Sequence, residues 1–138
     1  MRTLFTRTLA AAAVFAAPLL FSCAAAGEED MIQFTPGGVP YVIELQDHSV
    51  RANLAIVQVD SGNQGDLPIA TVEVRNTGAA EFRFRADFTW TDSDGRELIS
   101  PANASRTIHL MPGASTTLQS AAASPEAYRF KLQLRSEN

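Results

Sequence analysis

Apolar and polar residues alternate with a period of two through much of the chain, most clearly between residues 82 and 90. There an aromatic residue stands beside a polar one, as Phe84 beside Arg85 and Phe88 beside Thr89. Because successive side chains of a β-strand point to opposite faces of a sheet, this pattern predicts a strand with one buried face. We expect the aromatic residues of this strand and of the last one to be core, not a recognition platform. They are Phe82, Phe84, Phe88, Trp90, Tyr128 and Phe130.

Several further segments from Tyr41 onward show strand character. The shorter instances of the alternation are 70–75, 107–110, 116–122 and 128–135. Residues 54–59 are apolar on both faces for part of their length, which is typical of a central or sheltered strand. Turn-forming sequences separate the segments: Asp60–Asn63, Asn76–Gly78, Asp92–Gly95 and Met111–Gly113. About seven short strands with such turns predict an all-β fold, an antiparallel β-sandwich over residues 41–138.

The first 22 residues have the pattern of a bacterial export signal. Two arginines, Arg2 and Arg7, precede an apolar run of 13 residues that ends at Phe21. A membrane-spanning helix needs about 20 apolar residues, so this run is short for a retained anchor. The next residues complete the sequence Leu-Phe-Ser-Cys, which resembles a lipobox although Phe21 departs from its usual composition. The resemblance implies a signal peptide at 1–22 and acylation of Cys23.

Lipidation of Cys23 predicts that the membrane is a partner of this protein. Two or more acyl chains hold a protein stably on a bilayer, because each buried CH₂ contributes about 0.8 kcal/mol. Ala24 follows the cysteine, where aspartate would signal retention at the inner membrane, so the resemblance implies the periplasmic face of the outer membrane. The alternative is cleavage after Ala24 or Ala26, which would release a soluble periplasmic protein.

Cleavage before Cys23 leaves one domain preceded by a short N-terminal segment. Residues 23–40 combine an acidic cluster with several glycines and prolines and show no sustained period, so we expect a flexible tether. The mature chain keeps nine cationic residues against fifteen acidic ones, which gives a net charge of about −6. An acidic domain with a single lysine is a poor match for nucleic acid.

The residues that carry chemistry form no catalytic or metal-binding pattern, so we expect no enzyme, no metal and no cofactor. The two histidines, His48 and His109, lie far apart in the sequence and neither has a zinc-binding spacing. No serine stands in a Gly-x-Ser-x-Gly elbow. Asp92-x-Asp94-Gly95 has two carboxylates at the spacing of a calcium loop but lacks the other acidic ligands. We interpret it as a tight turn.

Five of the nine mature cationic residues fall on the predicted outward faces of two strands. They are Arg83, Arg85, Arg129, Lys131 and Arg135. If the two strands share a sheet, these residues form a basic stripe that suits an anionic envelope component or an acidic partner protein. The alternative interpretation is a solvated face whose charges deter pairing between sheet edges.

Six segments carry a family resemblance: Val72–Thr77, Phe82–Trp90, Asp92–Leu98, Leu110–Leu118, Pro125–Ala127 and Phe130–Arg135. Together with the lipidated start they resemble the YcfL family of small Gram-negative lipoproteins, over about residues 50–135. The resemblance implies an immunoglobulin-like sandwich tethered to the envelope, without a catalytic motif to carry over. Relatives often have a tryptophan near the position of Pro101, and this chain has none there.

These observations predict a non-enzymatic, lipid-anchored periplasmic module. We expect it to bind another envelope component through a sheet face or an edge strand. The alternative is an inhibitor or small-ligand sensor that acts through the end loops 60–66 and 99–106.

Overall fold

The computed structural model describes residues 33–34 and 38–137. The predicted signal peptide 1–22, Cys23 and most of the predicted tether 23–40 lie outside the described residues. Within the described ranges, no helix is long and apolar enough to cross a membrane.

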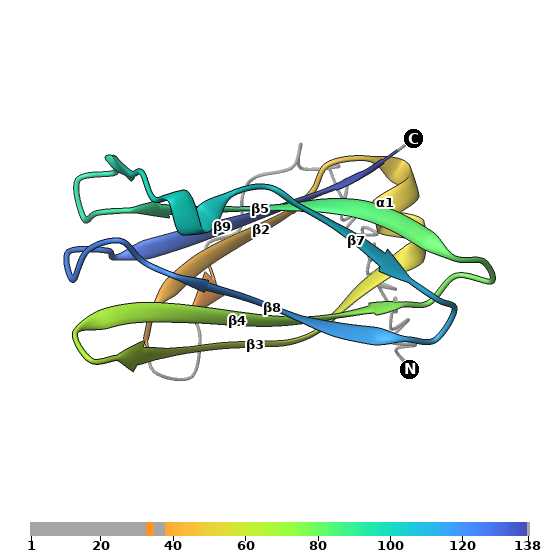
Figure 1. The fold of residues 1–138 in the computed structure, drawn as a ribbon, viewed down its shortest axis with the longest axis horizontal. Helices are drawn as coiled ribbons and strands as arrows, with labels where there is room; N and C mark the ends of the chain where they lie inside the picture. Colours follow the sequence, from red (N-terminus) through yellow and green to blue (C-terminus); the bar gives the residue numbers. More distant parts are fainter. Residues whose placement is uncertain (1–32, 35–37, 138) are drawn as a thin grey trace, which may run out of the picture.

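Two β-sheets pack face to face to form an all-β sandwich (Figure 1). The larger sheet has the order β1-β2-β9-β5, and the far side of β5 pairs with β6 at one end and with β7 at the other. Its strands are β1 (Gln33–Phe34), β2 (Pro40–Leu45), β5 (Phe82–Thr91), β6 (Glu97–Leu98), β7 (Arg106–Leu110) and β9 (Arg129–Ser136). The smaller sheet has the order β3-β4-β8 and consists of β3 (Leu54–Gln64), β4 (Leu67–Asn76) and β8 (Ser115–Ala121). Two short helices complete the described chain: α1 (His48–Asn53) and the 3₁₀ helix η1 (Pro101–Asn103).

The alternation in the sequence decides which side chains fill the space between the sheets. The buried side chains of β5 and β9 are Phe84, Ala86, Phe88, Trp90, Phe130, Leu132 and Leu134. The rings of Trp90 and Phe88 tilt against Phe130 at centroid distances of 5.4 and 6.1 Å, an arrangement that aromatic quadrupoles favour. Tyr128 was expected in this set but is 48% exposed, because it precedes β9. The other predicted aromatic core residues are buried, apart from the half-buried Phe82.

The predicted β-sandwich is confirmed, and each strand longer than two residues has a predicted counterpart except β2, which the sequence did not predict as a separate strand. One pairing differs from the expected antiparallel pattern. Strand β2 runs parallel to β9, with Tyr41 opposite Phe130 and Leu45 opposite Leu134. Parallel neighbours need a long connection, and here most of the chain lies between the two strands.

Strand β3 differs from the prediction in two respects. Asp60–Asn63 were expected to form a turn, but they continue β3 and pair with β4. The chain turns at residues 65–66 instead. Gly65 has a φ of +62°, which favours glycine. Residues 54–59 were expected to be a central or sheltered strand, yet among the described residues β3 pairs with β4 alone. Its apolar residues are explained by the core, because Leu54 is buried and Ile56 packs against the core cluster.

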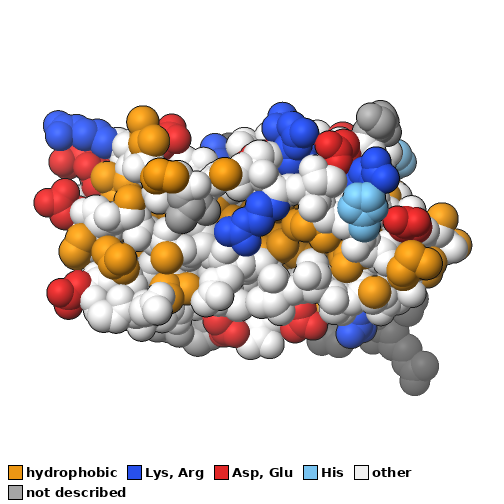
Figure 2. Space-filling view, viewed as in Figure 1, with side chains coloured by type: hydrophobic (Ala, Val, Ile, Leu, Met, Phe, Trp, Pro, Cys, Tyr) orange, Lys and Arg blue, Asp and Glu red, His pale blue; other side chains and the backbone are white. Residues whose placement is uncertain are grey.

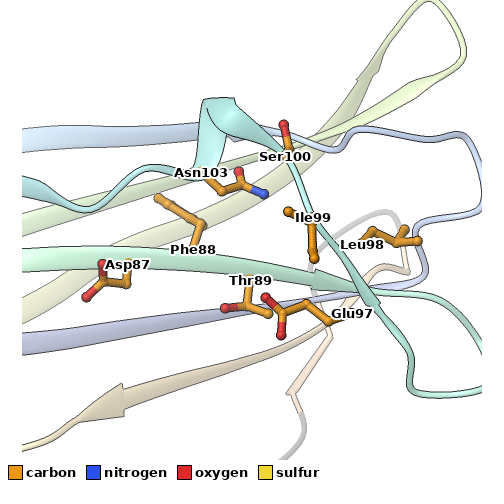
Figure 3. Close-up of a pocket in the computed structure, with 8 residues that line it drawn as sticks. All are labelled: Asp87, Phe88, Thr89, Glu97, Leu98, Ile99, Ser100 and Asn103. Carbon is orange, nitrogen blue, oxygen red and sulfur yellow. The ribbon is translucent and has the colours of Figure 1, made fainter.

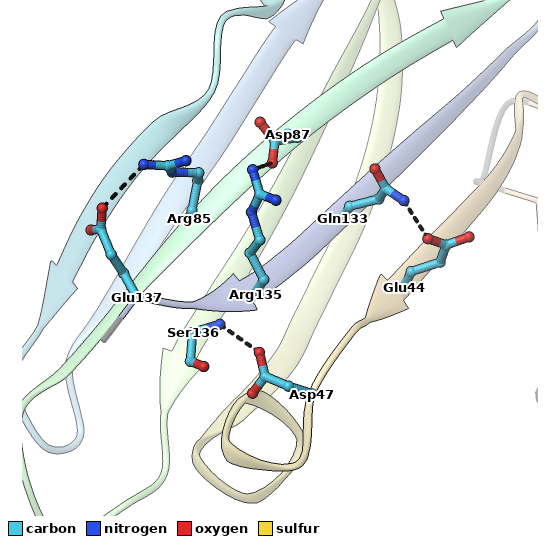
Figure 4. Close-up of polar contacts among 8 residues, drawn as sticks. All are labelled: Glu44, Asp47, Arg85, Asp87, Gln133, Arg135, Ser136 and Glu137. Carbon is cyan, nitrogen blue, oxygen red and sulfur yellow. Dashed lines mark hydrogen bonds and ion pairs between the residues drawn. The ribbon is translucent and has the colours of Figure 1, made fainter.

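Helix α1 has no counterpart among the predicted elements. Asp47 caps its start, since Oδ1 of Asp47 accepts the backbone N–H of Val50 at 2.9 Å. Oδ2 of the same carboxylate accepts the backbone N–H of Ser136 at 2.7 Å, as Figure 4 shows. Val50 of α1 is fully buried and belongs to the hydrophobic core. One side chain thus joins the start of α1 to the end of β9.

Replacing Asp47 with Ala is expected to lower the free energy of unfolding by about 1–2 kcal/mol at pH 7. Burial alone would raise the pKa of Asp47, but the N–H groups of Ser136 and Val50 outweigh it, so the pKa lies below its usual value. A depressed pKa in the folded state means that this stabilisation is present above about pH 4 and is lost as the pH falls through the folded-state pKa. Urea unfolding at pH 7 and about pH 2.5 measures the effect. The difference between wild type and Asp47→Ala should shrink in acid.

The matched control for this prediction is Asp94→Ala, which removes an exposed carboxylate that accepts no hydrogen bond within the described chain. We expect the stability of Asp94→Ala to stay within about 0.5 kcal/mol of wild type at both pH values. An Asp47→Ala deficit that is equal at both pH values would show that ionisation of this carboxylate plays no part.

Candidate functional site

The five cationic residues of the predicted stripe do lie on one face of the larger sheet. Strands β5 and β9 are direct neighbours, and Arg85 stands opposite Arg135, while Arg129 stands opposite Thr91. Because cross-strand partners share a face, the two cationic sets project from the same side, away from the core. Figure 2 shows cationic side chains mainly along the side of the larger sheet, with acidic side chains close beside them.

Carboxylates of β2, of β5 and of the residue after β9 neutralise most of this stripe. Arg135 pairs with Asp87 of β5 at 3.4 Å, Arg85 with Glu137 at 3.2 Å, and Lys131 with Glu44 of β2 at 3.0 Å. Figure 4 shows the first two of these ion pairs and the side-chain amide of Gln133, which donates to Glu44 at 2.6 Å. The face is therefore one of mixed charge, in which partly exposed pairs each contribute little stability.

The pKa of Glu44 lies below its usual value. The hydrogen bond from Gln133 is the largest cause, burial opposes it, and Lys131 adds a hydrogen bond and a favourable charge. Sequence reasoning missed Glu44 because it comes from β2, which joins this sheet through the unexpected parallel pairing with β9. No local signal in the sequence marks such a contact.

Two cationic residues of the stripe, Arg83 and Arg129, form no ion pair within the described part of the chain. They lie near opposite ends of β5, Arg83 opposite His109 of β7 and Arg129 opposite Thr91. The Nε of Arg129 is buried without a hydrogen-bond partner. These two side chains are too far apart along the strand to hold one small anion together.

A cavity of about 290 Å³ opens on the far side of β5, in a gap of the larger sheet (Figure 3). Strand β5 pairs with β7 over residues 82–86 and with β6 over residues 90–91, so residues 87–89 have no strand partner on that side in the described structure. The lining residues are Asp87, Phe88, Thr89, Glu97, Leu98, Ile99, Ser100 and Asn103. The cavity thus combines two carboxylates with apolar side chains, one of which, Ile99, is 87% exposed.

A chain of hydrogen bonds connects this cavity to the core. Trp90 Nε1 donates to Ser120 Oγ at 3.0 Å, and Ser120 Oγ donates to Asn103 Oδ1 at 2.6 Å. Asn103 belongs to η1, which lies beside the cavity (Figure 3). The position of η1 therefore depends on the buried Trp90 and Ser120.

The remaining candidate residues are engaged locally. Oδ1 of Asp92 accepts the backbone N–H groups of Asp94 and Arg96, each at 2.9 Å, and Gly95 has a φ of +82°, so the sequence forms the expected tight turn. His109 lies 3.3 Å from Glu81 on the surface. Within the described residues, no three His, Cys, Asp or Glu side chains are placed to hold a metal ion.

Comparison with known proteins identifies a family and a fold. The family model described as "Protein of unknown function (DUF1425)" matches residues 42–136. None of the curated proteins compared with the chain matches it. A crystal structure of Campylobacter jejuni cj0090 is similar, with a TM-score of 0.57 and 18% identity over 69% of this chain and 97% of that one. A DUF1425 family member from Shewanella sp. PV-4 is similar with a TM-score of 0.57 and 16% identity, over 78% and 96% of the two chains.

Proposed function

We propose, from the premise that this chain belongs to the DUF1425 family, that it is a lipid-anchored, non-enzymatic binding module of the bacterial envelope. One contrast carries the proposal. The polar side chains of the large sheet face are mostly engaged with one another, whereas the small sheet keeps a long strand edge without a partner among the described residues. A sheet face whose charges are already paired is typical of a solvent-exposed surface. An unpaired strand edge can bind another extended chain.

The anchor in this proposal is Cys23 at the end of the export signal. Two or more acyl chains would hold the sandwich at the membrane without any apolar patch on the domain itself. The similarity to YcfL-like lipoproteins and the alanine after the cysteine support the periplasmic face of the outer membrane as its location. A soluble periplasmic protein is the alternative.

The anchor is tested with the full-length gene expressed in a Gram-negative host, wild type beside Cys23→Ser. We expect the wild-type protein in the membrane fraction, with a mass above that of residues 23–138 by three acyl chains and a glycerol. The Cys23→Ser protein should lack this increment, because serine cannot form the thioether to the lipid. Intact-mass spectrometry and membrane fractionation measure both properties.

An unmodified wild-type product that begins near Gly27 and stays in the soluble periplasmic fraction would contradict the anchor. A variant at a neighbouring position, Ser22→Ala, is the control, since it keeps the cysteine and a small residue before it. It should be lipidated like wild type.

A second candidate function is a small-ligand sensor, and the cavity beside η1 favours it. The sequence predicted a ligand site formed by the end loops 60–66 and 99–106. Residues 60–64 belong to β3 and do not line the cavity, so only the second loop contributes to it. Glu97 would favour a cationic or hydroxyl-rich small molecule, whereas the Asp87 carboxylate is already paired with Arg135. Calorimetric titration of wild type and Glu97→Gln with such compounds separates this function from strand or surface binding.

A further inference from the structure

Strand β3 is the longest strand of the described sandwich and pairs on one side only. Its partner β4 matches it position by position, apart from a bulge between Ile56 and Gln58, which makes Val57 the extra residue. In Figure 1, β3 lies at the margin of the smaller sheet. The backbone groups on an unpaired strand edge can form a ladder with another extended chain.

The other edges are short or covered. On the opposite edge of the smaller sheet, the guanidinium of Arg106 donates to the backbone oxygen of Gln119 at 2.7 Å, and Asn103 accepts the hydroxyl of Ser120. In the larger sheet, β1 and β6 have two residues each, and β7 has five residues, among them Arg106 and His109. Short length, charge and covering contacts are the means by which natural sheets discourage edge pairing.

Strand β3 has few such safeguards: its bulge and one charged residue, Asp60. It contains no Lys, Arg or Pro over its eleven residues. Val57 is 46% exposed although it is apolar, and Ile56 and Val59 are only partly buried where they pack against the core. An added strand would remove apolar surface from water at this edge, which is favourable by about 25 cal/mol per Å².

The solvent face beside residues 57–60 is acidic, while Arg75 of β4 lies opposite Ala55 at the start of the edge and donates to Ser115 of β8. Asp60 of β3 lies opposite Thr71, and Glu73 of β4 lies opposite Gln58, so both carboxylates point away from the core. The Asp60 carboxylate accepts the side-chain amide of Gln58, and neither Asp60 nor Glu73 forms an ion pair with a described residue. A second copy of this acidic chain would bring the same carboxylates together, whereas a basic strand would complement them.

We propose that residues 54–60 of β3 accept an extended strand of a partner protein. The strand would alternate apolar residues, which face the sandwich beside Ile56 and Val59, with Lys or Arg residues, which face solvent beside Asp60 and Glu73. This inference rests on the proposed function as a binding module and names the binding edge and the chemistry of its partner. The basic side chains add specificity and speed of association, while the backbone ladder and the apolar residues supply most of the affinity.

The test uses a fluorescent peptide of eight residues with blocked ends, in which Val and Lys alternate, and the full-length protein. Fluorescence anisotropy gives the affinity, and protection of the amides of residues 54–60 from hydrogen exchange locates the site. We expect Val57→Lys to weaken binding about tenfold, because it replaces apolar contact by like charge at the edge. The matched control is Gln119→Lys, which adds the same charge on the exposed face of the opposite edge strand and should bind like wild type.

Three results would overturn this inference. The first is equal binding of a peptide that alternates Val and Glu, and the second is equal binding by Val57→Lys and wild type, with melting curves showing that both are folded. The third is a wild-type dimer in sedimentation that Val57→Lys dissociates, because the edge would then serve a second copy of the chain. Membrane partition of wild type and Cys23→Ser does not depend on β3. A protein that is lipidated but does not bind the peptide would therefore contradict the proposed strand binding at β3 without contradicting the proposed lipid anchor.

Discussion

Trp90→Ala should lower the free energy of unfolding by about 3–5 kcal/mol, a large part of the 5–15 kcal/mol typical of a domain. The indole of Trp90 is fully buried, and its ring centroid lies 5.4 Å from that of Phe130. Truncation leaves a cavity that rigid strands on both sides cannot close. It also removes the N–H that donates to Ser120 at 3.0 Å, and Ser120 in turn holds Asn103 of η1.

Urea unfolding followed by far-ultraviolet circular dichroism measures this effect, since the variant has no tryptophan for fluorescence. Trp90→Phe helps to separate the two causes, because it keeps an aromatic ring in the core and loses the hydrogen bond with a much smaller change of volume than Trp90→Ala. We expect it to cost about 1–2 kcal/mol and to loosen η1, which hydrogen exchange of residues 101–103 reports. A Trp90→Ala protein that unfolds at the wild-type urea concentration would show that the core is organised around other residues.

The strands of this fold were predictable because burial imposes a period of two on the residues themselves. Segments such as 82–90 and 128–135 contain that information locally, and the structure confirms them as β5 and β9. Strand β3 was predicted only in part. Its apolar first residues suggested a central or sheltered strand. One face of an edge strand also packs on the core, so the composition alone does not distinguish a central strand from an edge strand.

Contacts between distant parts of the chain were not predictable from the sequence. The five cations of the stripe were correctly assigned to one face of a sheet, because alternation assigns a face to each residue. Their neutralisation by Glu44 and Glu137 depends on which strands become neighbours, and the parallel pairing of β2 with β9 leaves no local pattern. Likewise, helix α1 is stabilised by a hydrogen bond from Ser136, 89 positions away from Asp47.

Asn76 is a second such case, and its replacement is the other change from which we expect a large effect. It was part of a predicted turn, yet its side chain is fully buried. Nδ2 donates to the backbone oxygens of Ala80 and Leu110 at 2.8 and 2.9 Å, and Oδ1 accepts the N–H of Gly78 at 2.9 Å. The side chain therefore holds the turn after β4 against the end of β7.

Asn76→Ala should lower the free energy of unfolding by about 2–4 kcal/mol, because it removes three hydrogen bonds that each contribute about 0.5–1.5 kcal/mol, and the one to Leu110 is buried. Urea unfolding at pH 7 measures the loss. The control is Thr117→Ala, a truncation to alanine on the exposed face of β8. It should change the free energy of unfolding by less than about 0.5 kcal/mol.

Asn76→Asp shows whether the hydrogen bonds, and not the shape of the side chain, are responsible. The carboxylate has almost the same shape, but when ionised it cannot donate to Ala80 or Leu110 and would be buried as a charge. The new carboxyl should thus have a raised pKa in the folded state, so its destabilisation is largest at neutral pH and is relieved as the pH falls, when the protonated acid regains one donor. Unfolding curves of Asn76→Asp at pH 7 and pH 4 should therefore converge toward wild type in acid, while those of Asn76→Ala do not. If both variants lose the same stability at both pH values, packing volume and not hydrogen bonding would explain why this asparagine is buried.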